Sequence, residues 1–128
     1  MAEGRIVFVE DDESYRYSLS RILEHEGYVV SAYEDYHGAI QLLETSDPVD
    51  LLVTDIRLPP RSPHGISLAH MARARRPSLP MLFITAYAEY ADEVPAELGQ
   101  TLVKPVETQA FLAAVAEAIA RRKPGIQG

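Results

Sequence analysis

Residues 5–12 read Arg-Ile-Val-Phe-Val-Glu-Asp-Asp, and this stretch decides the fold that we expect. An apolar run this short suits a β-strand that is buried on both faces, as in a parallel sheet. The run ends in carboxylates, so the strand delivers acidic side chains to one edge of the predicted sheet. A second run, Leu-Leu-Val-Thr-Asp at residues 51–55, has the same form and also ends in an aspartate.

Working outward from these two runs, strand-like and helical segments alternate along the chain. Further strand-like runs cover residues 28–33, 81–85 and 101–103. Apolar residues at helical spacing predict helices after residue 12, around residues 39–43, over residues 66–75 and up to about residue 122. We expect Asp12 to cap the first helix. Five strands alternating with helices predict an α/β fold with a doubly wound parallel sheet and right-handed crossovers.

Residues 86–99 carry the weakest helical pattern between two predicted strands. Pro95 argues against one long helix there, because proline lacks the amide that a helix interior needs. The fourth helix should therefore be short or irregular.

The composition fits one domain. The chain has 128 residues, 47% of them hydrophobic, and we expect a single domain over residues 1–128 with its core at about 5–122 and a tail at 123–128.

Twelve basic and nineteen acidic residues give a net charge of −7, which argues against nucleic acid or an anionic membrane as a partner. There is no cysteine, which excludes disulfides and thiolate chemistry. No apolar run spans a bilayer and the N-terminus has no signal-peptide pattern, so we expect a cytoplasmic location.

The residues that follow the predicted strands carry the chemistry. In a doubly wound sheet, ligands bind beyond the carboxyl ends of the strands. In chain order, those ends carry Glu10, Asp11, Asp55, Thr85 and Lys104. Carboxylates held together need a cation, and Mg²⁺ prefers oxygen ligands. A carboxylate beside Mg²⁺, a lysine and a hydroxyl is a suitable nucleophile for a phosphoryl group.

In the order and position of these residues, the chain resembles a receiver domain of two-component response regulators. The residues that carry the resemblance are Glu10-Asp11, Asp55, Thr85-Ala86 and Lys104-Pro105. It extends over about residues 5–122. It implies a flavodoxin-like receiver fold, as in a chemotaxis regulator, with five strands in the order 2-1-3-4-5.

The resemblance also implies a role for each of these residues. Asp55 is expected to accept a phosphoryl group from a histidine kinase or a phosphotransfer protein. Lys104 and the Thr85 hydroxyl are expected to bind that group, and the bond before Pro105 is expected to be cis. The Mg²⁺ ligands that it implies are Glu10, Asp11, Asp55 and the backbone carbonyl of Arg57.

Three features depart from the family pattern. Residues 56–64 form a longer and more proline-rich loop than is usual after the phosphorylated aspartate. Thr101 stands where the family usually has an aromatic switch residue, so the signal has to leave the site by another route. Arg57 and Tyr87 stand two positions after Asp55 and Thr85, and we expect them to gate access of water or of the phosphoryl donor.

Other functions fit parts of the sequence. A phosphatase with an aspartyl nucleophile needs a second aspartate at the position of Arg57. A flavin carrier needs a Ser/Thr/Gly-rich phosphate loop after the first strand, where this chain has Glu-Asp-Asp-Glu. A degenerate receiver, which binds partners without phosphorylation, stays open as the alternative because of Thr101 and the altered loop. We predict a phosphorylated signalling protein that acts by protein contact, with no enzymatic activity beyond self-dephosphorylation, and we leave a homodimer open.

Overall fold

The structure is a computed structural model, and it describes residues 3–57 and 65–121. Its strands are β1 (Arg5–Val9), β2 (Val29–Tyr33), β3 (Leu51–Asp55), β4 (Met81–Thr85) and β5 (Gln100–Val103). Its helices are α1 (Glu13–Glu26), α2 (Tyr36–Leu43), α3 (Gly65–Arg75), α4 (Ala88–Ala91) and α5 (Thr108–Ala120). All paired strands are parallel and follow the order β2-β1-β3-β4-β5, so the predicted fold class and strand order are confirmed.

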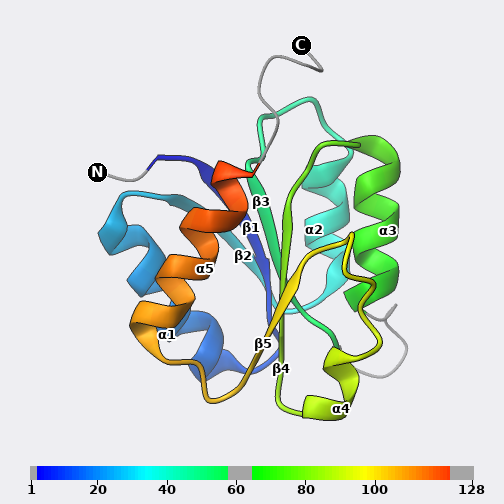
Figure 1. The fold of residues 1–128 in the computed structure, drawn as a ribbon. Coiled ribbons are helices and arrows are strands. Elements are labelled where there is room, and N and C mark those ends of the chain that lie inside the picture. Colours follow the sequence, from blue (N-terminus) through cyan, green and yellow to red (C-terminus); the bar gives the residue numbers. More distant parts are fainter. Residues whose placement is uncertain (1–2, 58–64, 122–128) are drawn as a thin grey trace.

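The helices cover both faces of the sheet, with α1 and α5 on one face and α2 and α3 on the other (Figure 1). Each face has its own core, because successive side chains of a strand point to opposite sides. In β1, for example, Val7 and Val9 belong to the core under α2 and α3, whereas Ile6 and Phe8 belong to the core under α1 and α5.

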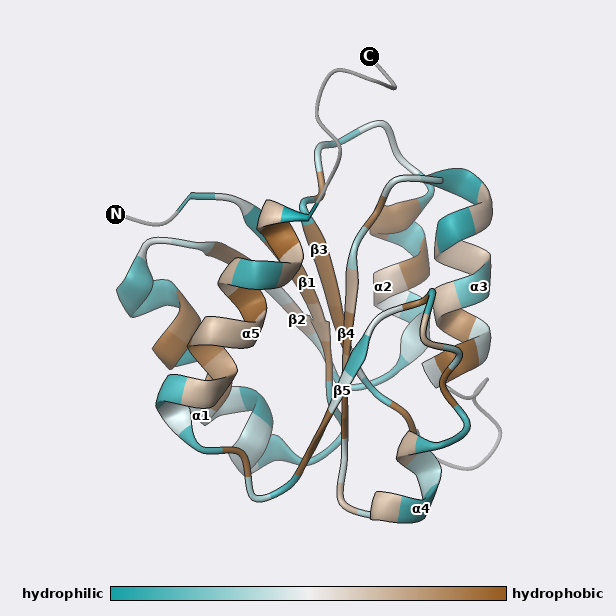
Figure 2. Ribbon diagram, in the orientation of Figure 1, coloured by the Kyte–Doolittle hydropathy of each residue, from teal (hydrophilic) through white to brown (hydrophobic). Residues whose placement is uncertain are grey.

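Burial separates the central strands from the edges of the sheet. Every residue of β3 and β4 is buried, and so are four of the five residues of β1. These strands form the apolar centre of the molecule (Figure 2). The edge strands β2 and β5 contain no fully buried residue. The continuous apolar runs of the sequence therefore mark the strands that have a neighbour on each side.

Local signals in the sequence set the ends of several helices. The carboxylate of Asp12 accepts a hydrogen bond from the backbone amide of Tyr15 at 3.1 Å, so the predicted cap of α1 is confirmed. Helix α4 has four residues, as expected for a segment that runs into Pro95. The long loop at residues 58–64 and the predicted tail at 123–128 lie outside the described residues.

Among the residues that the structure describes, no helix combines the length and the apolar character needed to cross a bilayer.

Candidate functional site

Five of the predicted site residues stand at the carboxyl ends of the strands: Glu10, Asp11, Asp55, Thr85 and Lys104. The ladder hydrogen bonds continue past the strands, from the Glu10 amide to the Tyr33 carbonyl at 3.0 Å and from the Lys104 amide to the Thr85 carbonyl at 2.7 Å. Asp55 is the last residue of β3. The backbone at each of these positions is therefore fixed by the sheet rather than by a free loop.

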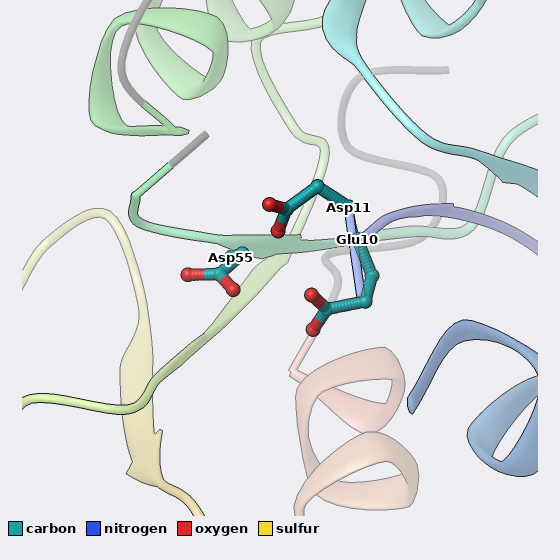
Figure 3. A group of neighbouring side chains, drawn as sticks. All are labelled: Glu10, Asp11 and Asp55. Carbon is teal, nitrogen blue, oxygen red and sulfur yellow. The ribbon is translucent and has the colours of Figure 1, made fainter. Parts of the chain in front are cut away.

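Three carboxylates form the centre of the site, which we call the acidic triad: Glu10, Asp11 and Asp55. One carboxylate oxygen of each lies within 4.8 Å of the others, and the side chains point toward one another (Figure 3). Glu10 is completely buried and Asp55 is 5% exposed, whereas Asp11 is exposed. The site thus has a buried floor and opens to solvent beside Asp11.

Lys104 is the cation of the site. Its Nζ lies 2.8 Å from Oε1 of Glu10 and 3.1 Å from Oδ2 of Asp55, and its side chain is only 11% exposed. The same Nζ lies 4.4 Å from the centroid of the Tyr15 ring on α1. One ammonium group therefore has two carboxylates and an aromatic face around it.

The residues of the site fit a hard divalent cation. Oε1 of Glu10 is buried and forms an ion pair with the Lys104 ammonium group at 2.8 Å. Three carboxylates against one lysine leave an excess of negative charge in a largely buried space, which is costly without a further cation. Carboxylate oxygens are the donors that Mg²⁺ prefers. The triad therefore fits the predicted Mg²⁺, with Glu10, Asp11 and Asp55 as candidate ligands.

Arg57 and Tyr87, the predicted gating residues, belong to one cluster above the site. The Arg57 amide donates to Oδ1 of Asp55 at 3.0 Å, which places the Arg57 backbone beside the acceptor carboxylate. The Arg57 side chain donates to the Tyr90 hydroxyl at 2.9 Å, and the Tyr87 ring packs edge-on against the Tyr90 ring at 5.5 Å. Tyr90 thus links the two predicted residues.

The two predicted threonines, Thr85 and Thr101, lie in different strands, and only Thr85 stands at the carboxyl end of its strand. Thr85 is completely buried, and its Oγ1 accepts from the Tyr87 amide at 3.2 Å. The hydroxyl also donates to the Tyr87 carbonyl at 3.4 Å and has to leave that bond before it can donate to a phosphoryl group. Thr101 lies half-buried in β5 opposite Phe83 and does not belong to the acidic triad. The Lys104–Pro105 bond is cis, as expected.

Two further residues near the site, Arg16 and Tyr90, were not predicted from the sequence. Nη1 of Arg16, on α1, donates to the carbonyl oxygen of Glu10 at 2.8 Å and so anchors the backbone of the acidic run. A signal for Arg16 existed, because a cation in the first turns of a helix opposes the helix dipole and needs a separate partner. Nothing in the sequence distinguishes Tyr90 from the other tyrosines.

Burial has an electrostatic consequence for Glu10. It raises the pKa of the Glu10 carboxyl from 4.5 to about 7, chiefly through desolvation and further through the negative charge of Asp55, while Lys104 and the Asp12 amide act in the opposite direction. The same surroundings raise the pKa of Lys104, since both carboxylates favour its charged form and outweigh its desolvation. A proton or a metal ion therefore relieves the buried charge of Glu10.

We expect Glu10→Gln to stabilise the metal-free protein at alkaline pH. Since the folded-state pKa of Glu10 lies above its unfolded value, this group stabilises the fold below about pH 4.5 and loses that contribution as the pH rises through 7. At pH 8 with EDTA the variant should melt higher by about 5 °C. The gain should disappear near pH 4, where Glu10 is protonated. A gain of equal size at both pH values in thermal melts contradicts the assignment.

Comparison with known proteins identifies the family. The model of the response regulator receiver domain matches residues 6–116. The chain is 32% identical over 122 residues to the DNA-binding transcriptional regulator NtrC of Proteus hauseri, of which it spans 25%, while 93% of this chain is covered. It is 38% identical over 87 residues to the response regulator receiver protein CpdR of Brucella abortus, covering 68% of this chain and 70% of that protein.

A solved structure also shares the fold. The response regulator TrrA of Thermotoga maritima, in complex with Mg²⁺ and a beryllium fluoride, superimposes with a TM-score of 0.79 at 25% identity. That superposition covers 90% of this chain and 98% of the other. With a family model that covers most of the sequence, the predicted fold, and the acidic cluster at the predicted edge, the chain belongs to the response regulator receiver domain family.

Proposed function

We propose that this receiver domain accepts a phosphoryl group on Asp55 and passes on a signal by protein contact. The observation that carries the proposal is the placement of the Asp55 carboxylate. Its Oδ1 is held by the Arg57 amide at 3.0 Å and its Oδ2 by Lys104 at 3.1 Å, beside two further carboxylates. A carboxylate fixed at both oxygens, 5% exposed and next to a cation is oriented for attack on phosphorus.

The transfer moves one phosphoryl group between two carriers. An oxygen of Asp55 attacks the phosphorus of a phosphohistidine on a histidine kinase or a phosphotransfer protein. The P–N bond breaks, its electron pair stays on the imidazole nitrogen, and an acyl phosphate forms. Lys104 then turns from the free carboxylate to the transferred oxygens and offsets their charge. The Thr85 hydroxyl leaves the Tyr87 carbonyl and donates to one of these oxygens.

Receiver domains bind Mg²⁺ at an acidic pocket of this kind. In this chain the ligands would be Glu10, Asp11, Asp55 and the carbonyl oxygen of Arg57. Mg²⁺ supplies positive charge at the phosphoryl oxygens when it is bound. Asp11 is the exposed member of the triad and gives the ion a route from solvent.

The remaining assignments follow from this reaction. We assign the receiver unit to about residues 5–122 and the protein to the cytoplasm, where a phosphohistidine donor is found.

NtrC, named as a DNA-binding regulator, is about four times as long as the part matched here, so its output is not transferred to this chain. Thr101 has no ring to swing inward, and the signal leaves through other residues.

The test is phosphorylation by acetyl phosphate, followed by intact mass. With Mg²⁺ the protein should gain the mass of one phosphoryl group, and with EDTA it should not. Failure of the protein to react with acetyl phosphate or to bind beryllium fluoride with Mg²⁺ would support the alternative, a degenerate receiver that binds partners without phosphorylation.

Arg57 and Tyr87 set the lifetime of the phosphoryl group in this proposal. The hydrogen bond and the ring contact join both side chains to Tyr90. In this proposal they cover the entrance and exclude water. We expect Arg57→Ala and Tyr87→Ala each to speed dephosphorylation several-fold after removal of the donor. Arg75→Ala is the matched control, because Arg75 is exposed on α3 and pairs only loosely with Glu44 at 3.8 Å. Unchanged rates in both variants would end the gating hypothesis.

A further inference from the structure

Among the interactions described for the Lys104 ammonium group, the one with Tyr15 involves an uncharged partner. It lies in the first turn of α1, and its amide is held by the Asp12 cap. Its ring is partly buried against the core under α1 and α5, and its centroid lies 4.4 Å from Nζ of Lys104. The ring is thus fixed by the helix and by the core, independently of the acidic triad.

The other two neighbours of Lys104 change during the proposed reaction. Glu10 is a candidate metal ligand, and a ligand bound to a divalent cation attracts the lysine less. Asp55 loses its free charge when it is phosphorylated. Among the described partners of the ammonium group, the Tyr15 ring keeps the same charge and position before and after transfer, and a ring face attracts an ammonium group at this distance, more strongly where solvent is excluded.

We propose that Tyr15 is a positioning residue for phosphoryl transfer: its ring keeps the Lys104 ammonium desolvated and aimed at Asp55 while the partners of Lys104 change. This inference rests on the proposed function. It adds to that function a residue that acts through Lys104 and does not touch the phosphoryl group. The ring face is the active element, so the phenolic hydroxyl is dispensable.

The test compares Tyr15→Phe with Tyr15→Leu. Phenylalanine keeps the ring face, whereas leucine keeps apolar volume without it. We expect the rate of phosphorylation by acetyl phosphate with Mg²⁺ to stay within twofold of wild type in Tyr15→Phe and to fall by about 2- to 30-fold in Tyr15→Leu, the range that a lost cation–π contact gives. The loss should appear in the maximal rate rather than in the acetyl phosphate concentration at half-maximal rate.

Tyr17→Leu is the matched control. Tyr17 is 64% exposed on the same helix and also faces a cation, since Arg21 lies 5.7 Å from its ring centroid, but it does not contact Lys104 among the interactions described. Its phosphorylation rate should equal that of wild type. Thermal melts of all variants show whether a lost rate reflects lost folding.

A second measurement needs no phosphoryl donor. Ring currents should shift the ε-methylene protons of Lys104 upfield in the NMR spectrum of wild type and of Tyr15→Phe, and this shift should be lost in Tyr15→Leu. If wild type shows the shift but takes up no phosphoryl group, the proposed function fails and the contact stands. If wild type is phosphorylated but folded Tyr15→Leu reacts at the wild-type rate, or Tyr15→Phe loses as much as leucine, the inference about Tyr15 is overturned.

Discussion

Asp55→Asn is expected to abolish phosphorylation by acetyl phosphate entirely, where the wild-type chain takes up one phosphoryl group. The amide oxygen of asparagine is a far poorer nucleophile than a carboxylate, and the acyl phosphate cannot form on it. The fold should remain, because Asp55 ends β3 and the ladder bond that follows it, from the Ile56 amide to the Ile84 carbonyl at 3.0 Å, does not involve its side chain. Intact mass after incubation with Mg²⁺ measures the result.

A matched variant separates this effect from a general loss of charge. Asp47→Asn removes an exposed carboxylate from the turn before β3, at the other end of the sheet, and should leave phosphorylation unchanged. Uptake by Asp55→Asn at wild-type stoichiometry would show that another side chain is the acceptor, and Glu10 and Asp11 would then be the residues to replace.

Gly65→Ala is expected to be the most destabilising single-methyl change at the site. Gly65 opens α3, and its amide donates to the Ile56 carbonyl at 2.8 Å. A methyl group on Gly65 would overlap the carbonyl oxygen of Asp55 and lie 2.9 Å from Cα of Ile56. Both are backbone atoms of a buried segment, so no side-chain rotation relieves the overlap. We expect a loss of about 3 kcal/mol or more, together with slower phosphorylation because Asp55 is displaced.

Gly38→Ala is the control for Gly65→Ala. Gly38 lies inside α2, and an added methyl there would overlap the Tyr33 ring, so that side chain has to shift, whereas at Gly65 the overlap is with backbone. Alanine also favours a helix over glycine by about 1 kcal/mol, which offsets part of the crowding. Urea unfolding should therefore show a smaller loss of stability for Gly38→Ala than for Gly65→Ala. Equal changes in the free energy of unfolding would contradict this prediction, because the backbone at the start of α3 would then move easily to accommodate the methyl group.

Much of this architecture was predictable because the central strands are buried on both faces. A run such as Ile6 to Val9 has no polar residues at alternate positions, so its pattern differs from that of a strand with one solvent-exposed face. Each run also ends at a residue of the predicted site. The short α4 was predictable from Pro95, and the cap of α1 from Asp12. These signals are local, and the fold agrees with them.

Contacts between distant side chains were not predictable in the same way. The sequence placed Lys104 at the site, but its position against the Tyr15 ring depends on how α1 packs on the sheet. Similarly, the sequence predicts that Arg57 and Tyr87 lie at equivalent positions after their strands. The hydrogen bond from Arg57 to the Tyr90 hydroxyl depends on where the single turn of α4 places Tyr90. The complete burial of Glu10 could not be predicted from the sequence either, because an acidic run at the start of a helix is compatible with full solvation.

The strands that position the carboxylates of the site have more hydrogen-bonded neighbours than the strand that positions the Lys104 ammonium group. Glu10 follows β1 and Asp55 ends β3, and both strands have a hydrogen-bonded strand on each side, whereas Lys104 follows β5, an edge strand. Amide exchange in folded domains reports that peripheral segments open at lower free energy than central strands. We therefore expect local opening to withdraw the ammonium group before the carboxylates, which would tie the lifetime of the phosphorylated state to the opening of one edge strand.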